Sequence, residues 1–207
     1  SPRLTFFATA IFIVDKGPFA GVISGAGGVT KNTAGTLTLT AANTYTGPTT
    51  ISGGILNANS STAIGDGSAT NTLILNGGTL QAAAAITSPA TRGVTLNGAS
   101  TSTIDTNNVT VTIAGVISGG TNAVNSLTVI STAGNAGNLT LSGNNTFLGN
   151  LIVNRGTLTA QTSTALGATG AGNTSTFNGN DGTTSTRLLL NAATATNIAE
   201  SLFMLGN

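Results

Sequence analysis

The 207-residue chain contains no cysteine, no histidine and no tryptophan, and charged residues make up only 5% of it. Without cysteine it can form neither disulfide bonds nor thiolate metal sites, and without histidine it lacks the commonest general base and metal ligand. Its six Lys and Arg are spread over the chain and the formal net charge is +1. No basic surface of the kind that binds nucleic acid or an anionic membrane is therefore expected.

Long hydrophobic runs are also missing. The longest, residues 6–14, is too short for a transmembrane helix, which needs about 20 residues. It has the length of a signal-peptide core, but Asp15 and Lys16 follow it in place of a small-residue cleavage site. We therefore expect neither a transmembrane segment nor a signal peptide within this chain.

The chain does contain an internal repeat. Residues 20–25, Ala-Gly-Val-Ile-Ser-Gly, return as residues 114–119, an offset of 115 − 21 = 94. The segment Gly35–Gly47 returns with substitutions as Gly137–Gly149, an offset of 137 − 35 = 102. Such repetition is typical of stacked structural units. We predict one domain, 1–207, with repeats at approximately 20–98 and 114–207; residues 1–19 are the least repeat-like. The change of offset places an eight-residue insertion (102 − 94) between Gly119 and Gly137, which predicts a loop that leaves the stack.

Short runs in which Val, Ile or Leu alternates with Thr or Ser predict β-strands throughout, and Gly-Gly, Asn-Gly and Asp-Gly pairs between them predict tight turns. The best helical candidate, Ala82–Ala85, has no N-cap. A sandwich or barrel would also give such strands, but a charge-poor surface suits stacked coils, where like charges about 4.8 Å apart would repel. We predict an all-β, right-handed parallel β-helix (β-solenoid) with roughly nine to ten coils of about 20 residues and no significant helix.

Several segments together resemble the autotransporter-associated β-strand repeat of bacterial passenger domains that are secreted by the type V route. They are Gly35–Gly47 with Thr49–Leu56, its second copy Gly137–Gly149 with Ile152–Leu158, and the pair Ser61–Gly65 and Ser163–Gly167. The resemblance covers roughly residues 20–190. It implies an extracellular or outer-surface location on a bacterium and a non-catalytic stalk or adhesin, with surface glycans or proteins, or adjoining coils, as partners.

An enzyme is the remote alternative, because some β-helices act on polysaccharides through clustered carboxylates. The acids are Asp15, Asp66, Asp105, Asp181 and Glu200. Asp66 and Asp181 lie in Gly- and Asn-rich turns, where their side chains are expected to bond their own backbone. We therefore predict no catalytic residues.

No motif in the chain predicts a cofactor or a metal. Residues Ser24–Gly28 are rich in glycine but match neither a calcium-binding repeat nor a dinucleotide motif, which Thr30 interrupts. Formal glycosylation acceptors in this Asn- and Thr-rich chain are attributed to chance; they begin at Asn59, Asn108, Asn138, Asn144 and Asn173.

Two residue types recur in register within the repeat and are predicted to be internal. Asn43 and Asn145 occupy the same position, which predicts turn or ladder asparagines, and Tyr45 and Phe147 are predicted to lie in the core.

The two ends of the chain are apolar where a solenoid usually carries polar caps. They are Leu4–Phe7 and Leu202–Leu205. Either further coils adjoin them or copies of the chain stack end to end. A self-assembling extracellular fibre is therefore the alternative to an adhesive passenger segment.

Overall fold

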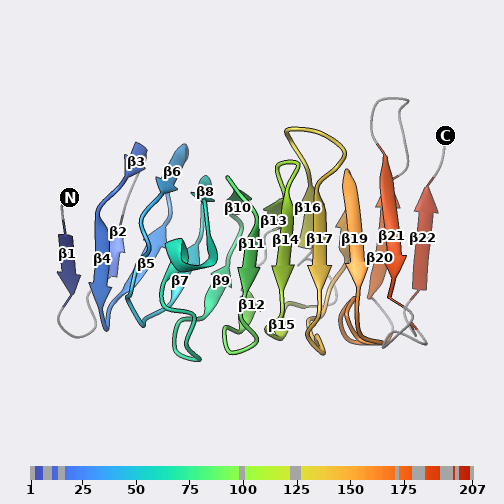
Figure 1. The fold of residues 1–207 in the computed structure, drawn as a ribbon. Helices are drawn as coiled ribbons and strands as arrows, with labels where there is room; N and C mark the ends of the chain where they lie inside the picture. The colour runs from blue at the N-terminus through green and yellow to red at the C-terminus, as the bar shows by residue number, and fades with distance from the viewer. Residues whose placement is uncertain are drawn as a thin grey trace.

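The chain winds into a parallel β-solenoid with three faces, as the computed structural model shows (Figure 1). The structure describes residues 3–6, 11–13, 17–97, 101–121, 127–170, 173–178, 185–191, 198 and 201–205. Every strand pair among them is parallel, and the chain passes the three faces in turn, although some passages across face 1 or face 2 form no strand. The predicted fold class is confirmed.

Face 1 consists of a two-stranded and a five-stranded sheet joined by irregular chain. Thr44 N donates to Ile23 O and Asp66 N to Tyr45 O, so residues 43–47 and the 3-10 helix η1 (Ser61–Ile64) continue the stack. The strands of this face are β1 (Arg3–Phe6), β4 (Val22–Gly25), β11 (Ile86–Ser88), β14 (Thr110–Ile113), β17 (Asn138–Leu141), β19 (Gly156–Ala160) and β21 (Thr186–Leu190).

Faces 2 and 3 each contain a single sheet. Face 2 contains β2 (Ile11–Ile13), β5 (Gly28–Lys31), β7 (Thr49–Ile51), β9 (Leu73–Leu75), β12 (Val94–Leu96) and β15 (Ile117–Gly119). Beyond β15, face 2 continues as irregular chain, since Thr146 N donates to Ile117 O. Face 3 contains β3 (Gly17–Phe19), β6 (Thr36–Leu39), β8 (Ile55–Ala58), β10 (Thr79–Ala82), β13 (Ser102–Asp105), β16 (Leu127–Ile130), β18 (Leu151–Val153), β20 (Thr174–Asn178) and β22 (Ser201–Leu205).

The core is made of apolar columns that run along the solenoid axis, because strand alternation turns every second side chain inward. One column on face 3 has seven buried members in register: Leu37, Leu56, Leu80, Ile104, Val129, Val153 and Phe177. Each inward residue thus covers the one below it, and no coil has to bury its apolar face alone.

The coils are longer than the sequence suggested. Within the Leu37 column the first step is 56 − 37 = 19 residues, but the next is 80 − 56 = 24 and a later one 129 − 104 = 25. Between β4 and β21, where all three faces are described, the chain makes about seven turns. The assumed coil length of about 20 residues was too short, because it ignored the extra residues at the corners. Among the described residues, face 3 has nine strands, one for each coil, which is at the lower end of the expected nine to ten coils.

In the described part of the chain, η1 is the one helix, and Ala82–Ala85 forms the end of β10 and a bend. No helix there has the length and apolarity to cross a membrane.

The sequence repeat does not return to the same face. Its first Val-Ile-Ser-Gly lies in β4 on face 1 and its second reaches β15 on face 2. Its first Thr-Leu-Thr-Leu is β6 on face 3, whereas the matching Asn-Leu-Thr-Leu is β17 on face 1. The repeat therefore advances by four coils and one face, so that its two copies are rotated about the axis.

The eight-residue insertion is divided between two corners. Stacking pairs Val29 with Thr49 and Leu127 with Leu151, so Val29 corresponds to Leu127 at an offset of 127 − 29 = 98. Four residues (98 − 94) are therefore added before β16, mostly outside the described residues. The other four (102 − 98) lengthen the turn that follows β16.

The repeated asparagines are internal, as predicted, and each of them bridges three coils. Asn43 Oδ1 accepts from Ile23 N at 2.8 Å and its Nδ2 donates to Ala63 O at 2.6 Å. Asn145 makes the same two bonds, 2.8 Å and 2.6 Å, with Ile117 N and Ala165 O. These side chains replace strand pairing where face 1 or face 2 is irregular.

The repeated aromatic residues are internal as well. Tyr45 is 0% exposed and Phe147 1%. The Tyr45 hydroxyl lies 2.6 Å from Thr49 Oγ1, which donates to Ile64 O at 3.0 Å. In the second copy Phe147 and Leu151 replace this polar pair, so the core prediction is confirmed for both aromatic residues.

Two of the few cations are structural. Arg92 is 1% exposed, and its guanidinium donates five hydrogen bonds of 2.7–3.0 Å. Nε and Nη2 donate to Asn71 Oδ1, Nη2 also donates to Gly65 O, and Nη1 donates to Ser61 O and Oγ. Burial lowers its pKa, and Tyr45 and Asp66 partly oppose that effect. Lys31 is 0% exposed, and its Nζ donates to Thr33 O.

Candidate functional site

The described acids show no catalytic arrangement. Asp66, in the turn after η1, accepts hydrogen bonds from Ser68 N at 3.0 Å and Ser68 Oγ at 2.8 Å, which is the predicted bonding within its own turn. Asp105, at the end of β13, lies at a different corner of the solenoid. Asp15, Asp181 and Glu200 lie outside the described residues. Among the residues described, no three of His, Cys, Asp and Glu cluster in a way that could hold a metal.

Asp105 ends a ladder of polar side chains on the outer surface of face 3. Asn57 Nδ2 donates to Gln81 Oε1 at 2.7 Å, and Gln81 Nε2 donates to Asp105 Oδ2 at 2.8 Å. The Asp105 carboxylate is 1% exposed and also accepts from Thr132 N at 3.0 Å and Thr132 Oγ1 at 2.6 Å. Both carboxylate oxygens of Asp105 therefore already accept hydrogen bonds from neighbouring coils.

The ladder is interrupted at the next coil. Ile130 pairs with Asp105 and takes the place of a polar residue. Beyond it the ladder resumes, because Asn178 Nδ2 donates to Asn154 Oδ1 at 2.5 Å. The gap lies at the corner between faces 3 and 1.

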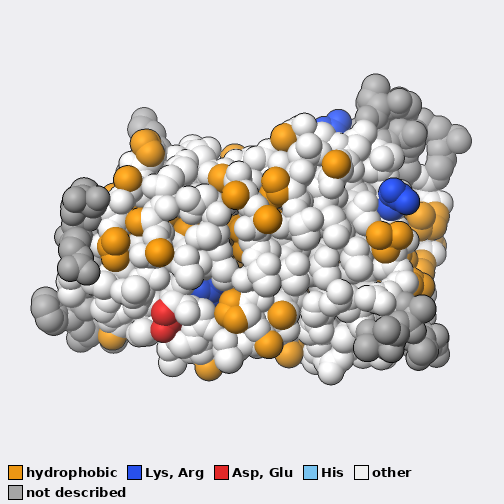
Figure 2. Space-filling model, viewed as in Figure 1, with side chains coloured by type: hydrophobic (Ala, Val, Ile, Leu, Met, Phe, Trp, Pro, Cys, Tyr) orange, Lys and Arg blue, Asp and Glu red, His pale blue; other side chains and the backbone are white. Residues whose placement is uncertain are grey.

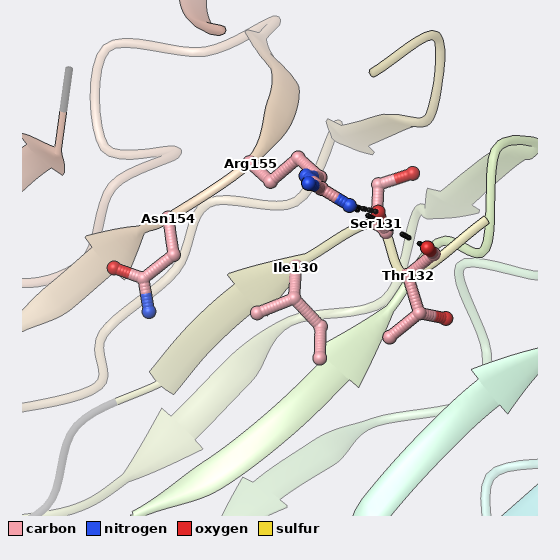
Figure 3. Close-up of a pocket in the computed structure, with 5 residues that line it drawn as sticks. All are labelled: Ile130, Ser131, Thr132, Asn154 and Arg155. Carbon is pink, nitrogen blue, oxygen red and sulfur yellow. Dashed lines mark hydrogen bonds between the residues drawn. The ribbon is translucent and has the colours of Figure 1, made fainter. Parts of the chain in front are cut away.

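A hollow of about 270 Å³ lies at this gap, lined by Ile130, Ser131, Thr132, Asn154 and Arg155. Figure 3 shows Arg155 reaching from the corner before β19 toward the turn after β16. Its Nη1 donates to Ser131 O at 3.3 Å and to Thr132 O at 3.5 Å. Arg155 is half-buried and Asn154 is exposed. The lining of the hollow is thus mostly apolar, with the polar groups of Arg155 and Asn154 at its edge.

The equivalent corner of the first copy is packed closely against backbone. Gly53 stands where the second copy has Arg155 (155 − 53 = 102), and a Cβ on Gly53 would lie 2.8 Å from Asn32 O. The short turn 32–35 therefore closes that corner against any side chain. In the second copy the turn after β16 is four residues longer, and Arg155 bonds the carbonyls of Ser131 and Thr132 in it.

Sequence reasoning did not identify the hollow. A lone arginine beside a turn glycine is usually a solvated surface residue. The available signal was the difference between copies, a glycine replaced by arginine next to an insertion. Neither feature alone points to a site, because only stacking brings residues 130–132 beside residues 154–155.

Comparison with known proteins agrees with the repeat seen in the structure. Residues 29–58 and 132–160 match the family model of the passenger-associated-transport repeat. The first match runs from β5 to β8 and contains Asn43, and the second ends with β19 and contains Asn145. The two matched segments thus include the equivalent bridging asparagines.

A curated relative agrees with this result. The chain is 45% identical over 97 residues, 47% of its length, to the adhesin BmaC autotransporter of Brucella suis biovar 1 (strain 1330). It covers 3% of that protein. No solved structure matches the chain. The resemblance drawn from the sequence is confirmed.

Proposed function

We propose that the chain is a segment of the extracellular passenger of a bacterial surface adhesin, and that it serves as a rigid, non-catalytic shaft carrying an adhesive surface. The similarity of its repeat to autotransporter passengers, one of them an adhesin, carries this proposal. Continuous apolar columns and bridging asparagines support a shaft, because each coil is fixed to both of its neighbours.

The outer surface fits a location outside the cell and contact with other surfaces. Figure 2 shows few charged side chains on the face viewed, among mostly uncharged polar groups. With so little charge, contacts made by this surface would depend weakly on ionic strength. Adhesion would therefore come from shape and hydrogen bonds, with charge acting at isolated points.

Attachment of the source bacterium tests the proposal. Deletion of residues 20–190 in frame should reduce attachment to host or bacterial surfaces while the remaining protein is still displayed, as measured by surface labelling with an antibody to another region. Unchanged attachment by cells with normal display would contradict an adhesive role.

End-to-end assembly is a second candidate, supported by the exposed apolar edge at β22. Phe203 is 50% exposed, Met204 62% and Leu205 55%. Met204 continues the inner column that begins at Leu37, since it stacks on Phe177. A further coil, from the same polypeptide or from a second copy, would bury these side chains. Sedimentation of the 207-residue chain separates the candidates: fibres abolished by Met204→Lys would support assembly, whereas a monomer at high concentration would contradict it.

A further inference from the structure

We propose that the hollow beside Arg155 binds a carboxylate-bearing sugar, such as a uronic acid residue of a surface glycan. This inference rests on the proposed function, since it names the ligand class of an adhesive segment. It assigns a specific role to a side chain that the scaffold does not require, because the first copy of the repeat has Gly53 at the position of Arg155.

Arg155 supplies the charge. Of the cations whose side chains the structure describes, Lys31 and Arg92 are buried, so Arg155 and Arg187 are the accessible ones. The bonds from Arg155 Nη1 to Ser131 O and Thr132 O are long, 3.3 Å and 3.5 Å, and they fix the side chain over the hollow. Its Nε and Nη2 donate to no described residue. A guanidinium with two free donors on one edge is suited to a carboxylate in bidentate geometry.

The rest of the rim suits hydroxyl groups. Asn154 Oδ1 is engaged by Asn178, which leaves its Nδ2 as a free donor at the gap. Thr132 Oγ1 donates to Asp105 Oδ2 and is directed away from Arg155 and Asn154 (Figure 3), so the donor for a sugar hydroxyl is Asn154 Nδ2. Ile130 offers an apolar floor for a ring face. These groups distinguish a sugar acid from a bare carboxylate.

Neutral sugars usually gain affinity by stacking on an aromatic ring, and the hollow has none. Tyr45, Phe147 and Phe177 are all buried in the core. Binding at the hollow must therefore come from hydrogen bonds and from the charge of Arg155. That requirement favours an acidic sugar over a neutral one.

Titration of the ¹⁵N-labelled 207-residue chain with glucuronic acid, observed by NMR, tests the proposal. Binding on the order of millimolar affinity should shift the amide signals of residues 130–132 and 154–155. Methyl glucoside and acetate are the two comparison ligands. Arg155→Gln should weaken glucuronic acid binding by roughly tenfold, and Arg187→Gln, which changes the net charge equally, should leave it unchanged.

Several outcomes would overturn the proposal. Absence of shifts at the hollow would do so, as would equal weakening by Arg187→Gln. Acetate binding as tightly as glucuronic acid would mean a general carboxylate site, open to acidic peptides, and would refute the sugar. If Arg155→Gln disturbs the fold, Asn154→Ala at the exposed rim should still weaken binding of the sugar more than that of acetate.

The two proposals fail separately. Loss of attachment on deletion, without binding of glucuronic acid by the purified chain, would leave the adhesive role intact and remove this ligand. Binding of glucuronic acid without any loss of attachment would remove the adhesive role and leave the site.

Discussion

At the residue scale, buried amides hold the coils together where strand pairing is absent. Asn43 and Asn145 each satisfy one backbone N–H below and one carbonyl above. Such groups would otherwise be buried without partners, which costs about 1–3 kcal/mol for each one. These two bonds explain why asparagine stands at positions 43 and 145, because its short side chain offers both a donor and an acceptor.

Replacement of Asn145 by Ala should therefore lower the free energy of unfolding by about 3 kcal/mol, measured by denaturant titration. The neighbouring Asn144 is the matched control, because it is exposed and its Oδ1 takes one long bond of 3.5 Å from Thr164 Oγ1. Asn144→Ala should change stability by less than about 0.5 kcal/mol. Equal effects of the two substitutions would refute the bridging role.

Tyr45 makes stability depend on alkaline pH. Burial raises its pKa well above the ordinary value, and the bond to Thr49 and the charge of Arg92 only partly oppose this. Above pH of about 10 the unfolded chain therefore loses the phenolic proton while the folded chain keeps it. The stabilisation by the buried, neutral phenol of Tyr45 is fully present below the pKa that this phenol has in the unfolded chain. Above that pKa the free energy of unfolding should fall by about 1.4 kcal/mol per pH unit.

Absorbance of tyrosinate measures this directly, because Tyr45 is the one tyrosine in the sequence. Ionisation should coincide with unfolding in the wild-type chain. Tyr45→Phe, which copies Phe147 of the second repeat, should remove the tyrosine contribution to the pH dependence. A folded chain that titrates near pH 10 would show that Tyr45 is accessible to solvent.

At the element scale, the corners between strands determine the coil length and the face on which each repeat copy lies. Alternation of apolar and polar residues was enough to predict the strands and the all-β class, since period 2 is a local property. Coil length depends on the turns instead: the step from Leu37 to Leu56 is 19 residues, whereas that from Leu56 to Leu80 is 24. Neither the rotation of the repeat nor the hollow at Arg155 could be predicted, because both depend on which corners hold the extra residues.

The corner around η1 depends on Arg92, whose guanidinium joins Ser61, Gly65 and Asn71. Arg92→Lys keeps the charge but cannot reach all of these acceptors. We expect a loss of about 2 kcal/mol or more. Hydrogen exchange should show reduced protection of the amides of residues 61–71 and unchanged protection in β17 and β19. Uniform loss along the chain would contradict a local role.

At the scale of the whole molecule, the solenoid is a one-dimensional stack in which each coil contacts its neighbours (Figure 1). The two copies of the repeat differ in orientation by one face. A surface feature carried by successive copies would therefore appear on successive faces of the shaft. The Arg155 hollow differs from such a feature, because the first copy has Gly53 in place of Arg155.

Cysteine cross-linking tests the stacked register most directly, because the chain has no native cysteine. Asn57 and Gln81 are neighbours in adjacent coils, and Asn57 and Thr79 lie two residues out of register on the same two strands. Asn57→Cys with Gln81→Cys should form a disulfide on mild oxidation, since paired strands bring Cα atoms within the range a disulfide can span. Asn57→Cys with Thr79→Cys should remain reduced. Cross-linking of the second pair but not the first would contradict the 24-residue coil and the solenoid built on it.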